Sequence, residues 1–179
     1  ERDDIYAAEI SFAWTVDSMP SDDEYMSWVG DYWAINKIEL PAAWDTETGD
    51  STILVGVIDN GIDGNHPDLQ NRVNTSLSKS FSIYDYGTDG LQDQSGHGTM
   101  AAGVIGAEAN NYLGVAGVCW DVQLVSLKTS LSESSFYLDP EAIELAIYHA
   151  HDMGIKILNM STSATVYNMY VHTAVAYYS

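Results

Sequence analysis

Apolar runs alternate along the chain with stretches of helical spacing, and this alternation predicts the order of the secondary structure. Three runs are short, rich in β-branched or aliphatic residues and nearly free of polar interruptions, as strands buried on both faces are. The predicted strands are STILVGVID (51–59), VQLVSLK (122–128) and IKILNMS (155–161). Three other stretches favour helices, namely HGTMAAGVIGAEA (97–109), DPEAIELAIYHAHDMG (139–154) and YNMYVHTAVAYY (167–178).

The second predicted helix has the clearest ends. Asp139 suits the N-cap, Pro140 suits the first helical position, and Gly154 follows the last turn. Its expected inward stripe is Ile143, Ala146, Ile147 and Ala150. This stripe leaves His149 and His151 on the polar face, so we expect neither histidine to be a ligand.

Strands that alternate with helices imply right-handed crossovers and a parallel sheet, so the sequence predicts an α/β fold. In such folds ligands bind at the carboxyl ends of the strands. Asp59 and Ser161 stand at the ends of the first and third predicted strands, and His97 opens the first predicted helix. We therefore expect these three polar side chains to share one edge of the sheet.

Composition narrows the choice of partners. The 179 residues provide room for one domain, or for part of a larger one. Six basic residues against 26 acidic residues give a formal net charge of −20. A surface this acidic repels phosphate, which argues against a nucleic-acid partner. It suits a cationic ligand such as calcium, and equally a solvated acidic surface without a ligand.

The cysteine content and the length of the apolar runs argue against an internal disulfide and against a membrane span. Cys119 is the one cysteine, so it has no partner for an internal disulfide, and its apolar neighbours predict a buried, unreactive thiol. The longest apolar runs fall well short of the roughly 20 residues that span a bilayer, so we expect no membrane span.

The chain opens on ERDDIY, without a methionine or a signal-peptide pattern. Either a leader has been removed or the sequence is a segment of something longer.

His97 lies between two glycines and follows Asp59 by 38 residues. An imidazole with open space on both sides suits a general base. A buried carboxylate can fix the tautomer of such a base and stabilise its charged form. A turn that happens to contain a histidine is the alternative. The two residues alone do not decide between a catalytic pair and a turn.

Longer motifs around these residues resemble those of the subtilisin-like serine proteases (subtilases, peptidase family S8). The family's aspartate and histidine motifs are matched by VGVIDNGIDGNHPDL and SGHGTMAAGVIGAEANNYLGVAGV, and its substrate-binding strand by ILNMS. The start of its mature catalytic domain is similar to PSDDEY and YWAINKIELPAAWD. The resemblance implies a three-layer, doubly wound parallel sheet of subtilisin-like type, incomplete at its C-terminus. It assigns 20–179 to the N-terminal part of a peptidase domain and 1–19 to a propeptide tail or N-terminal extension.

The resemblance also implies roles for individual residues. Asp59 would orient His97, and His97 would be the general base of a serine-type endopeptidase acting on peptides or proteins. The backbone of Ser161, Thr162 and Ser163 would bind the substrate as an added strand. Ser163 departs from the family, which carries glycine there, and its Cβ predicts a narrowed pocket or a shifted strand. The family further implies a secreted or cell-envelope location.

Two parts of the family's machinery have no counterpart in the 179 residues. The nucleophilic serine of the family lies in a Gly-Thr-Ser-Met-Ala-like motif, and no such string occurs. The asparagine that completes the oxyanion hole should follow a strand beyond residue 179. We therefore expect this chain to be inactive alone and to need the missing C-terminal half in cis or in trans. A non-catalytic remnant of the fold is the alternative.

Calcium is the cofactor that the resemblance implies. The matching positions are Asp22 (with Asp23 as a substitute), Asp68, Asn111, and the carbonyl groups of Leu113 and Val115. Oxygen ligands on loops suit the high and flexible coordination number of calcium. A set of ordinary turn residues is the alternative. The expected calcium site is structural and takes no part in the chemistry.

Overall fold

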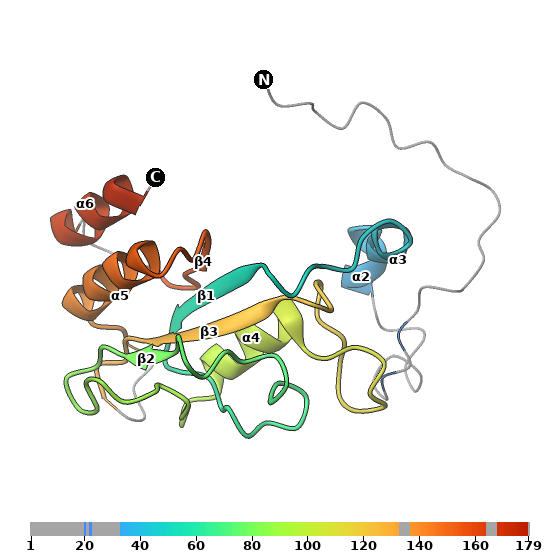
Figure 1. The fold of residues 1–179 in the computed structure, drawn as a ribbon, viewed down its shortest axis with the longest axis horizontal. Helices are drawn as coiled ribbons and strands as arrows, with labels where there is room; N and C mark the ends of the chain where they lie inside the picture. Colours follow the sequence, from blue (N-terminus) through green and yellow to red (C-terminus); the bar gives the residue numbers. More distant parts are fainter. Residues whose placement is uncertain (1–19, 21, 23–32, 133–136, 164–167, 179) are drawn as a thin grey trace.

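A computed structural model of the chain describes residues 20, 22, 33–132, 137–163 and 168–178 (Figure 1). Its centre is a four-stranded parallel sheet in the order β2-β3-β1-β4. The strands are β1 (Leu54–Asp59), β2 (Lys79–Ser80), β3 (Gln123–Lys128) and β4 (Ile157–Asn159). The helices are α2 (Trp33–Lys37), α3 (Leu40–Trp44), α4 (His97–Gly106), α5 (Pro140–Asp152) and α6 (Met169–Tyr178). The predicted α/β fold with a parallel sheet is confirmed.

Helices cover both faces of the sheet, with α5 and α6 on one side and α4 on the other (Figure 1). Alternate strand residues enter two separate cores because side chains on a strand point to opposite faces. On the side of α5, Ile58 and Leu127 are at most 1% exposed, while Val57 and Leu124 are fully buried on the side of α4. Three layers therefore hold β1 at the centre of the molecule.

The predicted helix at 139–154 is confirmed as α5. The Asp139 carboxylate accepts a hydrogen bond of 3.0 Å from the Glu141 N–H, as an N-cap should. The expected inward stripe is buried: Ile143, Ala146, Ile147 and Ala150. His151 is exposed, but His149 is half-buried and packs on Phe81 with a ring separation of 5.4 Å. The polar-face prediction was therefore wrong for His149.

Several predicted boundaries differ from those of the structure. The first strand begins at Leu54 rather than at residue 51, because Thr52 donates its N–H and its hydroxyl to Asp50 in a tight turn. The first helix ends at Gly106 rather than at 109, because Ala107 is extended. The third strand is shorter than predicted and covers Ile157–Asn159. The pattern did not predict β2, α2 and α3, which are too short to show a period.

Cys119 is half-buried rather than fully buried, which corrects one prediction. Burial, and then the charge of Glu47, raises the pKa of its thiol. A raised pKa keeps the sulfur protonated near neutral pH, so the expected lack of nucleophilic reactivity stands. Across the described residues, no helix combines the length and apolarity needed to cross a bilayer.

Candidate active site

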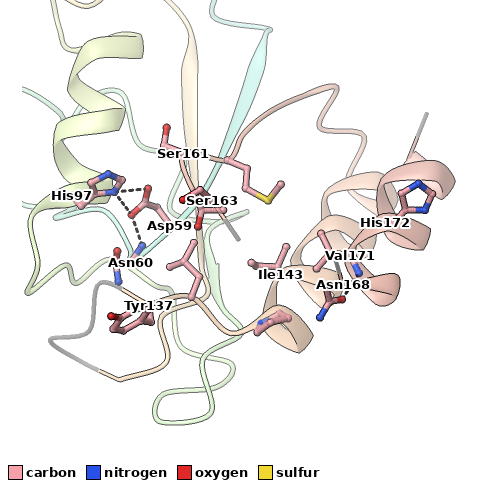
Figure 2. Close-up of a pocket in the computed structure, with 14 residues that line it drawn as sticks. Asp59, Asn60, His97, Tyr137, Ile143, Ser161, Ser163, Asn168, Val171 and His172 are labelled. Carbon is pink, nitrogen blue, oxygen red and sulfur yellow. Dashed lines mark hydrogen bonds and ion pairs between the residues drawn. The ribbon is translucent and has the colours of Figure 1, made fainter. Parts of the chain in front are cut away.

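Asp59 and His97 meet at the carboxyl end of β1 (Figure 2). The Nδ1 atom of His97 lies 2.8 Å from Oδ1 and 2.9 Å from Oδ2 of Asp59. The Asp59 side chain is 1% exposed, whereas that of His97 is 42% exposed. Because an ionised carboxylate only accepts hydrogen bonds, Nδ1 carries the proton and Nε2 of the neutral ring is left to accept one. The pair thus presents a basic nitrogen towards solvent.

The glycines on either side of His97 serve two different purposes. Gly96 has a φ of 79°, a left-handed conformation that turns the chain into α4. Gly98 needs its missing side chain for a different reason: a Cβ there would overlap the carbonyl oxygen of Gly61 and lie 3.0 Å from the Cβ of Asp59. The first turn of α4 therefore packs directly against the backbone that follows β1, and this contact brings His97 to Asp59.

The Asp59 carboxylate has a second donor. The N–H of Asn60 donates to Oδ1 over 2.7 Å, and the carbonyl oxygen of Asp59 accepts the N–H of Thr129 over 2.8 Å. These bonds fix the carboxylate and its backbone from both sides. Asn60 is itself 2% exposed and lines the same pocket as the pair.

A pocket of about 660 Å³ opens beside the pair, between β4 and the starts of α5 and α6 (Figure 2). The predicted substrate-binding residues Ser161, Thr162 and Ser163 line it together with Asp59 and His97. Their role in binding a substrate stays a prediction. The structure does place all five in one cavity, so the expected gathering at one sheet edge is confirmed.

The opposite wall of this pocket was not predicted from the sequence. It consists of side chains from α6, from α5 and from the segment before α5: Tyr137, Leu138, Pro140, Ile143, Asn168, Val171 and His172. Helical periodicity assigned Ile143 to the core, and a residue at a helix start can face the core and a pocket together. One feature of the sequence could have indicated this wall: both helices follow predicted strands, so each begins at the carboxyl edge of the sheet, where the pocket lies.

The residues expected to bind calcium also come together, away from the pocket. Asp22 accepts hydrogen bonds from the N–H groups of Asn110 (2.9 Å) and Asn111 (3.4 Å). Asp68 accepts the Asn111 side-chain amide over 2.7 Å and the Val115 N–H over 2.9 Å. Both carboxylates are buried, at 0% and 3% exposure. The loop 110–115 thus joins two aspartates that are distant in sequence.

Negative charge accumulates in this cluster. Burial, and to a lesser degree the charge of Asp68, raises the pKa of Asp22. Within the described part of the chain, neither aspartate has an ion-pair partner. Buried oxygen donors with uncompensated charge fit a hard cation such as calcium. The Asn111 side chain, however, turns its NH2 group towards Asp68 while its oxygen accepts the Leu113 N–H over 2.8 Å, so this amide must turn before its oxygen can bind a cation beside Asp68. Asp23 lies outside the described residues.

A parallel sheet that carries a buried Asp–His pair beside a pocket defines an α/β protein with the layout of a hydrolase site. Residues 50–176 match the subtilase family, so the chain belongs to that family. It is 31% identical over 165 residues to the thermophilic serine proteinase of Bacillus sp. (strain AK1), covering 92% of this chain and 38% of that protein. It is also 31% identical over 141 residues to thermitase of Thermoactinomyces vulgaris, covering 79% of this chain and 48% of thermitase.

A solved structure supports the same assignment. Sphericase superposes with a TM-score of 0.64 at 31% identity, covering 74% of this chain and 44% of sphericase. The chain thus spans less than half the length of each of these three proteins. The resemblance predicted from the motifs is confirmed at the level of the family, and the subtilisin-like sheet is confirmed with it.

Proposed function

We propose that the chain forms the base-bearing part of a serine-type endopeptidase. The observation that carries this proposal is the hydrogen bond from His97 Nδ1 to the buried Asp59, beside a pocket, in a member of the subtilase family. In this role His97 Nε2 removes the proton from a serine hydroxyl as its oxygen attacks the peptide carbonyl. The proton then passes from His97 to the leaving amine, and water repeats the sequence on the acyl-enzyme. Asp59 keeps the proton on Nδ1 throughout.

The serine in this proposal comes from polypeptide outside these 179 residues. Among the described residues, no hydroxyl makes a hydrogen bond to Nε2 of His97. A second hollow, of about 400 Å³, lies beside the imidazole and is bordered by His97, Met100, Ala101, Val104, Ile105, Asn159 and Ser161. Two of these side chains, Met100 and Val104, are 64% and 66% exposed. An apolar hollow next to the base is a suitable place for the segment that brings the nucleophile, in cis or in trans.

A peptide is the substrate that the main pocket fits. Among the described strands β4 lies at an edge of the sheet, and Ser161–Ser163 follow it after Met160. An extended peptide can add to such an edge through main-chain hydrogen bonds. The facing wall is largely apolar, with Leu138, Ile143 and Val171. We infer a preference for substrates that place an apolar side chain against this wall.

The test is labelling with a fluorophosphonate, which reacts with activated serines, on the full gene product that contains these residues. We expect labelling of the full product, no labelling of the 179-residue chain alone, and loss of labelling in His97→Ala. The matched control is His151→Gln, because His151 is exposed and lies against Tyr177, away from the pocket. A full product that stays unlabelled while folded would overturn the proposal.

We also propose that Asp22 and Asp68 hold a structural calcium ion, with Asn111 and the loop carbonyl groups of Leu113 and Val115. Support comes from the burial of both carboxylates and the raised pKa of Asp22. Calcium there would neutralise the paired charges and tie the segment at residue 22 to the loop 110–115. It has no part in the reaction, since the cluster and the pocket share no residue.

Location outside the cytoplasm is a further proposal. By their names, the relatives include a minor extracellular protease, Epr of Bacillus subtilis (strain 168), and an intracellular serine protease of Paenibacillus polymyxa. We infer a secreted or cell-envelope protein from the family resemblance. Cell fractionation with an antibody to this chain tests the inference, and recovery in the cytoplasmic fraction alone would overturn it.

A further inference from the structure

The carboxylate of Asp93 collects hydrogen bonds from both sides of His97. Its Oδ1 accepts the Ser95 N–H (3.0 Å), the Ser95 hydroxyl (2.8 Å) and the Gly96 N–H (2.9 Å). Its Oδ2 accepts the Thr99 N–H (2.9 Å) and the Thr99 hydroxyl (2.8 Å). One side chain thus binds the residues just before and just after the imidazole.

These bonds replace an ordinary N-cap. Helix α4 starts at His97, and Gly96 at the cap has no side chain to accept the free N–H groups of the first turn. Asp93 accepts one of them from Thr99, and its negative charge lies at the positive end of the helix. Burial opposes ionisation, but the hydrogen bonds from Thr99, Ser95 and Gly96 outweigh it and hold the pKa of the Asp93 carboxyl below its usual value. The acceptor is therefore charged at neutral pH.

The same network reaches the loop that leaves Asp59. The Thr99 hydroxyl oxygen accepts the N–H of Asp63 over 3.0 Å, so its own proton is free to go to Asp93. Two backbone hydrogen bonds of 3.4 Å also join the loop after Asp59 to the segment before Asp93. The Ile62 N–H donates to the carbonyl oxygen of Gly90, and the Gly64 N–H donates to that of Leu91. A chain of donors from Asp63 through Thr99 to Asp93 therefore runs beside the Asp59–His97 hydrogen bond.

We propose that Asp93 is a positioning residue that holds the backbone of His97 at the distance from which Nδ1 reaches Asp59. The catalytic consequence rests on the proposed function, but the positioning itself does not. Without Asp93, the loop 93–96 and the first turn of α4 lose their common anchor. His97 then keeps its helix but loses its fixed relation to Asp59, and a displacement of about 1 Å can cost on the order of 100-fold in rate.

Substitutions separate positioning from general stability. Asp93→Asn turns one acceptor oxygen into an N–H₂ group that faces N–H donors, so at least one set of bonds is lost. Thr99→Val removes the hydroxyl that links Asp63 to Asp93 but keeps the hydrogen bond from the backbone N–H to Asp93. Thr99→Ser keeps both the hydroxyl and the N–H. Asp50→Asn is the matched control, because Asp50 accepts the N–H and hydroxyl of Thr52 (both 2.7 Å) in the same way, far from the site.

The experiment is long-range ¹H–¹⁵N NMR on the 179-residue chain labelled with ¹⁵N-histidine, recorded above the titration range of the imidazoles. A free imidazole favours the proton on Nε2, so the fraction of His97 protonated on Nδ1 reports its hydrogen bond to Asp59. We expect the Nδ1–H form to dominate in the parent chain, in Thr99→Ser and in Asp50→Asn. We expect it to be lost in Asp93→Asn and reduced in Thr99→Val.

Two outcomes overturn the proposal. One is an unchanged Nδ1–H fraction in both Asp93→Asn and Thr99→Val, whether or not their melting temperatures fall below that of Asp50→Asn. The other is an equal loss in Thr99→Ser. Because this readout needs no turnover, it stays informative if the full gene product shows no peptidase activity. In an active product, Asp93→Asn should lower kcat by at least about tenfold while KM stays unchanged.

Discussion

Lys128 is the register neighbour of Asp59 in the parallel sheet, yet its ammonium group pairs with Asp85, 2.7 Å away. The Lys128 side chain is 5% exposed and that of Asp85 is 27% exposed, so this ion pair is largely removed from water. The pairing has a consequence for the site: the buried cation next to the Asp59 backbone is already engaged, and the Asp59 side chain is left to His97.

Replacing Lys128 alone should destabilise the fold. Lys128→Met leaves the Asp85 carboxylate in a half-buried place without its cation, and we expect a loss of about 3 kcal/mol in the free energy of unfolding. Urea denaturation followed by circular dichroism measures it. The double variant with Asp85→Leu should recover part of the loss, because two apolar groups leave no unpaired charge. No recovery in the double variant would contradict this explanation.

Adding a methyl group at Gly98 should push the first turn of α4 away from the backbone that follows β1. Gly98→Ala forces a Cβ against the Gly61 carbonyl oxygen, so we expect about 1–3 kcal/mol of destabilisation and a loss of the Nδ1–H form of His97. Gly103→Ala is the matched control in the same helix, since a Cβ there meets nothing within 4 Å. That control should stabilise the chain by about 0.5–1 kcal/mol.

Acid should unfold the chain through Asp93 and Asp85. Burial raises the pKa of each, but hydrogen bonds outweigh it, so both folded pKa values lie below the ordinary 3.8. As the pH falls below about 4, the unfolded chain takes up protons first, and the stability present above that pH is lost. Urea midpoints at pH 6 and pH 3 measure the change. Asp93→Asn should show a smaller drop between the two pH values than the parent chain.

Calcium should stabilise the chain at neutral pH. The pKa of Asp22 is raised, so its ionised form costs stability as the pH rises above 3.8, and a bound cation offsets this cost. At about 100 times its dissociation constant, calcium would contribute about 2.7 kcal/mol. Thermal unfolding in calcium and in a chelator, at pH 7 and at pH 4, measures this. We expect a gain at pH 7 that shrinks at pH 4 and disappears in Asp68→Asn, with magnesium as the control ion.

Sequence patterns predicted the elements that are long enough to show a period. Helix α5 carried both an N-cap at Asp139 and a stripe beginning at Ile143, and each of these local signals agrees with the tertiary packing. The end of α4 was misplaced because the chain leaves the helix at Ala107, which is buried in one core with Val122 and Leu124, residues that come later in the sequence. His149 was misplaced for the same reason, since the partner that buries it, Phe81, lies 68 residues away.

The residues of the candidate site also fall into those with a local sequence signal and those that only tertiary packing brings to the site. Asp59 and His97 could be predicted because each has a distinctive local sequence. Residues such as Val171 and His172 could not, because only the packing of α6 on α5 brings them to the pocket. The role proposed for Asp93 also needed the structure, since five donors converge on it from a short loop that has no period.

The strand order carries a consequence for how the protein is made. Of the strands that the structure describes, β1 lies inside the sheet but is synthesised first, and Val55 pairs with Ile157, 102 residues later. At about 5–20 residues per second on the ribosome, this pairing waits roughly 5–20 seconds. During that interval the apolar segment LVGVI of β1 lacks the neighbour that closes one of its edges. The strand that ends in Asp59 therefore keeps one unpaired edge in the nascent chain until β4 has been made, and such an edge favours aggregation.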